Sequence, residues 1–115
     1  MATQPEEFLT FTDIYAQNYL LAPNDILYVE ADNIYSRIVC ENLIIRVPHP
    51  LILMETLLPD YFLRIHRSFL VNQNSIVALY RRIVMLRNGF RLPVPHGKYQ
   101  WLKECLEATE TNTLP

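Results

Sequence analysis

The sequence predicts a mostly β fold of short antiparallel sheets, with one short internal helix and a short C-terminal helix. Three observations support this fold class. Short runs of β-branched and aromatic residues recur along the chain and are separated by turn residues. An Asn-Gly pair stands between two apolar runs, which is a strong short-range signal for a β-hairpin. The apolar spacing that is typical of a helix occurs in only two segments.

Nine strands follow from these runs. Asn88-Gly89 predicts a hairpin between the last two strands, because this pair supplies the positive φ angles that a two-residue turn requires. Glu41-Asn42 predicts a second tight connection, and Asp32-Asn33 predicts a loop. The nine predicted strands are residues 7–12, 18–21, 26–30, 34–40, 43–47, 68–71, 75–80, 83–87 and 90–94.

Two segments have helical periodicity. Apolar residues recur at three- and four-residue steps from Leu51 to Leu58. Pro50 stands at a tolerated starting position, and Pro59 ends the run. This pattern predicts a short helix packed on the sheet. A second amphipathic pattern follows Gly97 and predicts the C-terminal helix.

The length of 115 residues, half of them apolar, fits one compact domain. We expect a disordered N-terminus over residues 1–6, a domain over 7–108 and a frayed tail over 109–115. The acidic, polar N-terminus and the absence of a long apolar run predict a cytoplasmic protein with no membrane contact. Cys40 and Cys105 stand far apart among apolar neighbours, so we expect buried thiols.

Charge is distributed unevenly along the chain. The net charge is only −2, which by itself argues against a non-specific polyanion binder. Residues 61–98, however, contain no Asp or Glu, whereas acidic residues lie on both sides of this segment. The asymmetry favours one electropositive face and nucleic acid as the partner. The cations of the segment are Arg64, Arg67, Arg81, Arg82, Arg87, Arg91 and Lys98.

No catalytic or cofactor site is expected. His49, His66 and His96 lack the spacing of a metal or acid-base set, and Ser68 lacks the context of a nucleophile. An enzyme that uses His66 with Cys40 or Ser68 is the least favoured function class, because no spacing brings a base, an acid and an oxyanion donor together. With only two glycines, the chain also lacks the phosphate-cradling motifs of nucleotide-binding proteins.

Most of the basic residues have a structural interpretation as well as a functional one. A solvated sheet edge fits Arg87 and Arg91 best, because they flank the predicted hairpin turn. Arg81 and Arg82 are adjacent, so in an extended chain only one of them faces a given ligand. Arg64 and Arg67 are three residues apart, which in a strand places them on opposite faces. One of the two side chains can therefore brace the fold while the other reaches out.

The remaining polar residues also have two interpretations. Ser68 either donates to a phosphate beside an arginine or simply begins a strand. His96 lies in an exposed turn, where a contact role competes with solvation. Asn72 and Asn74, on either side of Gln73, are most simply turn formers between two strands.

The segment FLRIHRSFLVN, residues 62–72, closely resembles the signature of the LytTR family, which consists of bacterial DNA-binding domains of transcription regulators. Four further blocks resemble that family in the same order: residues 25–36, 51–59, 76–79 and 88–94. The similarity spans roughly residues 8–106, nearly the whole chain. Several blocks in the right order are far more specific than one motif.

The resemblance implies an elongated β fold whose loops, instead of a recognition helix, enter successive major grooves on one side of the duplex. It also implies that two copies bind paired direct repeats. Carried over by position, the contact loops correspond to residues 32–37, 67–68, 81–82 and 95–98. The base-contact candidates are Ser36, Arg67, His96 and Lys98. The phosphate-contact candidates are Arg37, Ser68, Arg81 and Arg82. Arg67 is the strongest candidate, because a guanidinium can bond guanine bidentately.

Two departures from the family pattern concern the contact loops. Pro95-His96-Gly97-Lys98 replaces the basic residues that many members carry after the last strand. Asp32 lies in the first contact loop, where it would repel phosphate unless it turns away or accepts from a cytosine amino group. Family members often follow a phosphorylation-receiver domain, for which 115 residues leave no room, so the chain is either a free-standing member or a fragment.

The sequence therefore predicts a sequence-specific, double-stranded DNA-binding domain of a bacterial transcription regulator, without a cofactor or a small-molecule substrate. The alternative is a protein-interaction module of LytTR-like fold that binds a partner regulator instead of DNA. Chain-wide acidity favours the alternative, and the acid-free basic segment favours DNA.

Overall fold

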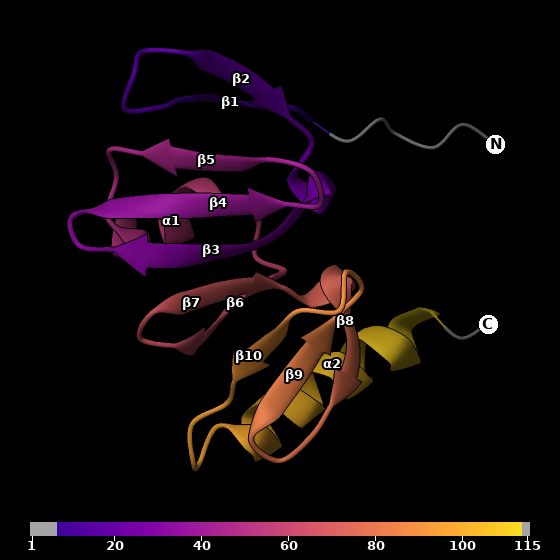
Figure 1. Ribbon diagram of the computed structural model, residues 1–115. Coiled ribbons are helices and arrows are strands. Elements are labelled where there is room, and N and C mark those ends of the chain that lie inside the picture. The colour runs from indigo at the N-terminus through magenta and orange to yellow at the C-terminus, as the bar shows by residue number, and fades with distance from the viewer. Residues whose placement is uncertain (1–6, 114–115) are drawn as a thin grey trace, which may run out of the picture.

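Ten β-strands and two α-helices form the part of the chain that the computed structural model describes, residues 7–113 (Figure 1). Side chains are described for residues 7–108. The predicted disorder over residues 1–6 lies outside the described part. The strands are β1 (Leu9–Thr12), β2 (Asn18–Leu21), β3 (Ile26–Asp32), β4 (Tyr35–Cys40), β5 (Ile44–Val47), β6 (Phe62–His66), β7 (Phe69–Asn72), β8 (Ile76–Leu79), β9 (Ile83–Leu86) and β10 (Arg91–Pro93). The helices are α1 (Leu51–Leu57) and α2 (Tyr99–Thr113), and two 3-10 turns are η1 (Pro23–Asp25) and η2 (Gln73–Ser75).

The strands form three antiparallel sheets, which confirms the predicted fold class. A two-stranded sheet, β1-β2, is followed by a five-stranded sheet in the order β5-β4-β3-β7-β6 and by a three-stranded sheet in the order β10-β9-β8. Figure 1 shows them one below the other. The family resemblance implies an elongated fold. The principal extents of 42 × 42 × 24 Å instead describe a flattened molecule with two equally long dimensions.

Each face of the five-stranded sheet covers a hydrophobic core. The first core lies toward α1 and the β1-β2 hairpin, and the second lies toward the three-stranded sheet and α2. Strand β3 contributes Ile26 and Val29 to the first core, and Leu27 and Tyr28 to the second. The pairing register with β4 shifts between Ile26 and Tyr28. Such a bulge allows two successive residues to face the same side.

The predicted strands match the observed ones to within one or two residues at most ends, but β6 was not predicted. The sequence alternates polar and apolar residues from Arg64 onward, as a strand entering a turn would, but the adjacent apolar residues Phe62 and Leu63 break the pattern at its start. The register with β7 shifts between Arg64 and His66, and Ile65, at that shift, is completely buried in the second core.

The predicted hairpin at Asn88-Gly89 is present, but its loop has three residues instead of two. The Gly89 N–H donates to the Leu86 carbonyl, and the Leu86 N–H donates to the Phe90 carbonyl, both at 2.8 Å. Only Gly89 has a positive φ, of 89°, in this loop. The Asn88 side chain instead accepts the Phe90 N–H at 3.0 Å. This is a turn closed by a left-handed glycine, the usual solution for three-residue hairpins.

Both helices are confirmed, and the second is longer than expected. The sequence predicts a frayed chain from residue 109, whereas α2 continues through Thr113. No Gly or Pro interrupts residues 109–113, so the helix has no local cause to end there. Neither helix in the described chain is long and apolar enough to cross a membrane.

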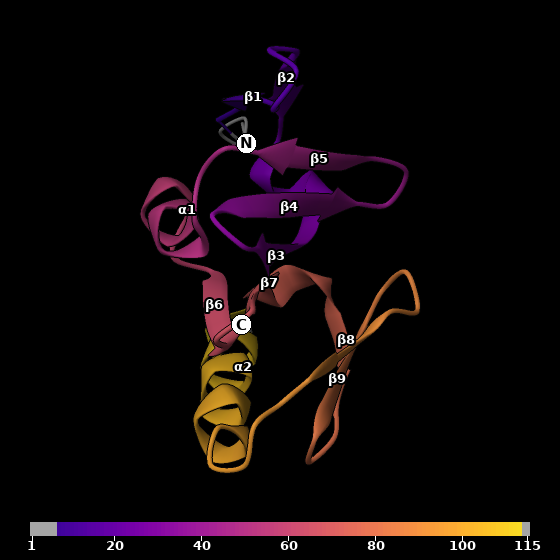
Figure 2. The same ribbon diagram turned by 60° about the vertical axis from the view of Figure 1, so that its left-hand side comes forward.

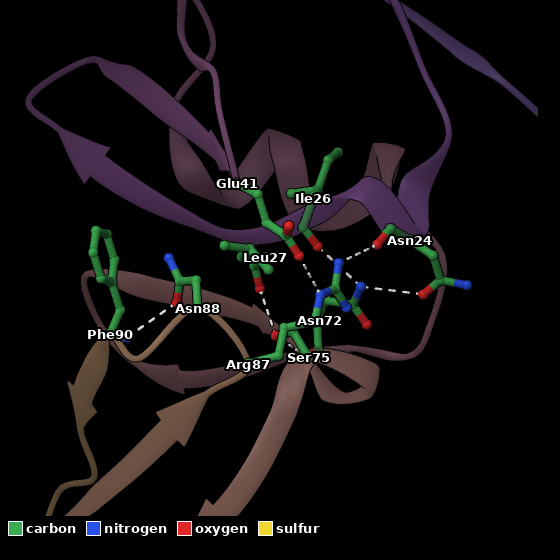
Figure 3. Close-up of polar contacts among 9 residues, drawn as sticks. All are labelled: Asn24, Ile26, Leu27, Glu41, Asn72, Ser75, Arg87, Asn88 and Phe90. Atoms are coloured by element: carbon green, nitrogen blue, oxygen red, sulfur yellow. Dashed lines mark hydrogen bonds and ion pairs between the residues drawn. The ribbon is translucent and has the colours of Figure 1, made fainter.

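A buried polar joint connects the two larger sheets (Figure 3). The amide nitrogen of Asn72 donates to the Ile26 carbonyl at 2.9 Å and to the Asn24 side chain at 3.1 Å, while its oxygen accepts the Asn74 N–H at 2.9 Å. Ser75, also fully buried, donates to the Leu27 carbonyl. Asn72 is thus a turn former, as predicted, but it also ties β7 to the start of β3.

Arg87 completes the joint on its exposed side. Its Nε donates to Glu41 at 3.0 Å and its Nη2 donates to the Asn24 carbonyl at 2.8 Å. The sequence predicts a solvated edge for Arg87, but the guanidinium links the β9-β10 hairpin to the β4-β5 turn. The prediction was wrong because the partners lie 46 and 63 residues away in the chain.

Candidate nucleic-acid interface

The four predicted contact loops lie on the same side of the molecule. Figure 1 shows the β3-β4 and β6-β7 turns at the left, and the β8-β9 turn and β10-α2 loop at the lower left. Figure 2, in which that side comes forward, shows the same four connections. We call residues 33–34 and 67–68 the upper turns, and residues 80–82 and 95–98 the lower turns. The β4-β5 and β9-β10 turns lie on the opposite side (Figure 1).

Ser36 does not belong to the exposed part of the upper turns. The sequence predicts a base contact for it, but its side chain is completely buried and its hydroxyl donates to the His49 carbonyl at 2.7 Å. Ser36 is two residues from Ile38, which lies in the first core, so the alternation of β4 directs both side chains inward. Its role here is to hold the segment before α1.

A cluster of paired charges lies at the end of β3 and the start of β4. Asp32 accepts from the Nε of Arg46 at 2.7 Å, and the Arg46 guanidinium lies 4.7 Å from the ring centroid of Tyr35. Arg37 lies beside Glu30 at 3.6 Å, with 41% of its side chain exposed. The negative charge of Asp32 is therefore offset within the protein. Arg37, a predicted phosphate contact, is accessible but already has an acidic neighbour.

The β6-β7 turn presents Arg67 to solvent and holds its backbone firmly. Arg64 donates from Nε to the His66 carbonyl at 3.1 Å and from Nη2 to the Arg67 carbonyl at 2.9 Å. The Ser68 N–H donates to His66 Nδ1 at 3.0 Å, and the Ser68 carbonyl accepts the Ala31 N–H at 2.9 Å. The last bond joins this turn directly to the end of β3, so the two upper turns form one unit.

The lower turns enclose a depression of about 260 Å³. Arg81 and Arg82 both line it, together with His96 and the first turn of α2. The sequence predicts that adjacent arginines point to opposite sides, but the chain bends at these residues instead of remaining extended. The Val94 N–H donates to the Arg82 carbonyl at 2.8 Å and so fixes the two lower turns to each other.

Aromatic rings support the cations of the lower turns. The Arg81 guanidinium lies 5.3 Å from the ring centroid of Tyr99, and the Lys98 ammonium lies 4.6 Å from that of Trp101. Both distances permit a cation–π interaction, which leaves the charge available to a further ligand. His96 is exposed in the loop that precedes α2. Gly97 has a φ of 96°, a conformation that favours glycine there.

The arginines thus fall into two groups. Among the described side chains, four arginines have a carboxylate partner within 4 Å, and none of the cations at the tips of the four turns does: Arg67, Arg81, Arg82 and Lys98. The turns that carry these cations lie on one side of the molecule (Figure 1). The pairing pattern is compatible with the predicted electropositive face, which stays a prediction because Arg91, near the β9-β10 turn, also has no carboxylate partner among the described side chains. No group of metal-ligating side chains occurs in the described part of the chain.

Three functional neighbours were not identified from the sequence. Glu55 of α1 pairs with Arg64 at 3.1 Å, Arg46 neutralises Asp32, and Gln100 lines the lower depression. The partners of Glu55 and Arg46 are distant in the chain, so no local pattern reveals these pairs. Gln100 donates from its side-chain nitrogen to Glu104 at 3.1 Å, and nothing in its sequence context marks it as part of the depression.

Comparisons with known proteins identify the family to which the chain belongs. The chain matches the family model of the LytTr DNA-binding domain over residues 16–107. This span covers most of the 115 residues, and the protein therefore belongs to the LytTR DNA-binding domain family. The family is non-catalytic, so the protein is a DNA-binding domain and not an enzyme.

Among solved structures, the chain is similar to the LytTr DNA-binding domain of a Bacillus cereus protein described as a methyl-accepting/DNA response regulator. The identity is 28% and the TM-score is 0.71, and the match covers 90% of this chain and 98% of that one. No curated protein is significantly similar in sequence.

Proposed function

We propose that this domain reads a specific double-stranded DNA sequence for a bacterial transcription regulator. The upper and lower turns enter successive major grooves from one side of the duplex. Two copies occupy paired direct repeats. The similarity to a domain from a protein described as a response regulator supports a role in regulation.

The single observation that carries the proposal is the β6-β7 turn. Arg67 is exposed and has no acidic partner among the described side chains, while hydrogen bonds hold the carbonyls on both sides of its Cα. A guanidinium in a fixed position can bond both acceptors of guanine in the major groove. Within the proposed interface, His96 and Lys98 lie near further base edges.

The other turn residues contact the backbone in this proposal. Arg81 and Arg82 neutralise phosphates from the lower depression, and Arg37 and the half-buried Ser68 do so from the upper turns. Contacts of this type fix the position of a protein on DNA but carry no direct sequence information. Affinity is then expected to fall steeply with salt, because each neutralised phosphate releases counterions.

The proposal is tested by selecting sequences from a random duplex pool and titrating binding to the selected site with salt. We expect an enriched direct repeat for the wild type. Arg67→Ala should bind this site about 1–3 kcal/mol more weakly and lose preference at one base position, as expected for the loss of a bidentate contact.

Arg91→Ala is the matched control. It removes the same charge from the start of β10, which lies beside the β9-β10 turn on the opposite side of the domain (Figure 1). This variant should retain the affinity and the base preference. Equal losses of Arg67→Ala on all sequences would assign Arg67 to a phosphate, and no enrichment at low salt would contradict the proposal.

A protein-interaction module is the second candidate, and one surface favours it. Helix α1 exposes Ile52 (68%) and Leu57 (45%) on its outer side. A depression of about 370 Å³ beside it is lined by Leu57, Leu9, Phe11 and Pro48, among others. Apolar groups that stay exposed in this way are typical of partner contacts. If this function is correct, the wild type binds a partner regulator and selects no DNA sequence, and Ile52→Asp abolishes binding to that partner.

A further inference from the structure

Arg64 holds the β6-β7 turn from within the protein. Its guanidinium donates to the carbonyls of His66 and Arg67 at 3.1 and 2.9 Å. The third nitrogen lies 3.1 Å from the Oε1 of Glu55, which belongs to α1. Only 30% of the Arg64 side chain is exposed. One planar group therefore connects the helix to two successive peptide units of the turn.

The chemistry of this arrangement is specific to arginine. A guanidinium presents donors in a rigid, planar fork, whereas a lysine ammonium is a point charge on a flexible stem. Glu55 fixes the far side of the fork, so the near side stays directed at the two carbonyls. The turn consequently has fewer conformations available, and the Cα of Arg67 keeps one orientation relative to β3.

We propose that Arg64 and Glu55 are positioning residues, which orient Arg67 for its base contact without touching DNA themselves. The inference rests on the proposed function of the turn. Binding of a preorganised side chain loses less conformational entropy than binding of a mobile one, so the pair should contribute to sequence preference. It should contribute little to the attraction between the domain and DNA of arbitrary sequence.

The test compares Arg64→Ala with Arg87→Ala. Arg87 is a matched control, because it also pairs with a glutamate (3.0 Å), donates to a backbone carbonyl (2.8 Å) and is 32% exposed. It lies, however, on the opposite side from the four turns. Both variants are measured for binding to the selected site, binding to random duplex, the salt slope, and amide hydrogen exchange of Ser68 in the free protein.

For Arg64→Ala we expect about tenfold weaker binding to the selected site, comparable to a lost base contact. Binding to random duplex and the salt slope should remain as in the wild type, and the Ser68 amide should exchange faster. Arg87→Ala should change neither the base preference nor the exchange of Ser68. Arg64→Lys retains the charge without the fork, so it should also lose base preference.

Glu55 provides an independent test with little risk to folding, because 43% of its side chain is exposed. Glu55→Gln retains an acceptor for Arg64 and should keep most of the base preference, whereas Glu55→Ala should lose part of it. An Arg64→Ala variant that binds the selected site as tightly as the wild type would overturn the inference. So would an equal loss on all sequences with a shallower salt slope, because Arg64 would then be a phosphate contact.

Failure of the proposed function can be distinguished from failure of the positioning role, because hydrogen exchange is measured without DNA. If the wild type selects no DNA sequence, the proposed function fails, and hydrogen exchange in the free protein decides whether Arg64 positions the turn. Faster exchange of Ser68 in Arg64→Ala, but not in Arg87→Ala, would retain the positioning role. Unchanged exchange in both variants would reject it.

Discussion

The upper turns and the lower turns differ in how they hold their charges. In the upper turns, ion pairs and backbone bonds surround the exposed group: Arg46 offsets Asp32, and Arg64 holds the carbonyls beside Arg67. In the lower turns, Arg81 and Lys98 lie against aromatic rings, with no carboxylate within 4 Å among the described side chains. One region is rigid and nearly neutral, and the other is strongly positive.

This difference separates two requirements of sequence recognition. Discrimination between bases needs a donor in a defined position, a role that our proposal gives to the braced turn. Attraction to the duplex needs positive charge near phosphates but no fixed geometry, a role that our proposal gives to the basic depression. A net charge of −2 is compatible with DNA binding because four of the acidic groups pair with arginines away from the turn tips.

The largest expected effect concerns the buried amide of Asn72, which ties β7 to the residues around the start of β3. Asn72→Ala removes three hydrogen bonds of a completely buried side chain: one to the Ile26 carbonyl at the start of β3, one to the Asn24 side chain in η1 and one from the Asn74 N–H. Figure 3 shows the first two. We expect the free energy of unfolding to fall by about 2–3 kcal/mol, because the Ile26 carbonyl is left without its partner. Urea unfolding measures this change.

Asn74→Ala is the control for that prediction. Asn74 donates from its exposed side chain to Asn24 at 2.9 Å, so its loss should be compensated largely by water. An Asn72→Ala protein that is no less stable than Asn74→Ala would show that the buried bonds between β7 and the start of β3 do not stabilise the fold.

The next effect concerns the lower turns alone. Arg81→Ala combined with Arg82→Ala should lower the magnitude of the salt slope by about 0.9 for each phosphate contact, hence by about two in total. Affinity should fall for the selected site and for random duplex alike, since phosphates are the same in every sequence. Fluorescence anisotropy at several salt concentrations measures both. An unchanged slope with an altered base preference would reverse the roles of the upper and lower turns.

A smaller effect is expected from the ion pair at the β3-β4 turn. Arg46→Ala leaves the Asp32 charge uncompensated near the duplex, so binding should weaken a few-fold, by about 0.5–1 kcal/mol as for an exposed pair. Adding Asp32→Asn should restore the affinity of the wild type. If the double variant binds no better than Arg46→Ala, Arg46 itself contacts DNA.

The sequence predicts the parts of this architecture that depend on local periodicity. Turn residues and alternation locate nine strands, and proline spacing locates α1. Phe62 and Leu63 break the alternation at the start of β6, and the chain bends at Arg81-Arg82, so the sequence missed β6 and the position of both arginines at one depression. The burial of Ser36 could have been predicted, because it lies two residues before the apolar Ile38 on the same face of β4.

No local pattern in the sequence reveals which distant residues pair in the fold. Arg64, Arg67 and Arg87 are equivalent as a list of cations, and only the fold gives two of them glutamate partners. Family resemblance supplied the predicted contact loops, whereas the proposed distinction between positioning and contacting residues required the tertiary structure.

The last expected effect concerns Cys40, on the side opposite the four turns, and is confined to alkaline pH. The thiol is half-buried, and burial raises its pKa to about 11, with Asp25 raising it further and Arg87 lowering it. Because the folded-state pKa lies above that of an unfolded cysteine, about 8.5, the thiol contributes stability below that pH. The contribution is lost as the pH rises toward 11. The free energy of unfolding of the wild type should therefore fall more steeply between pH 8.5 and 11 than that of Cys40→Ala.

The same pKa predicts that Cys40 reacts slowly with a thiol reagent at pH 7.5, since little thiolate is present. DNA binding should be unchanged after such treatment, because the modified position would lie away from both the upper and the lower turns. Mass spectrometry of the treated protein and binding to the selected duplex measure the two effects. Rapid modification of Cys40 with loss of binding would mean that the β4-β5 side also takes part in the interface, and the separation of the molecule into a DNA side and a free side would be wrong.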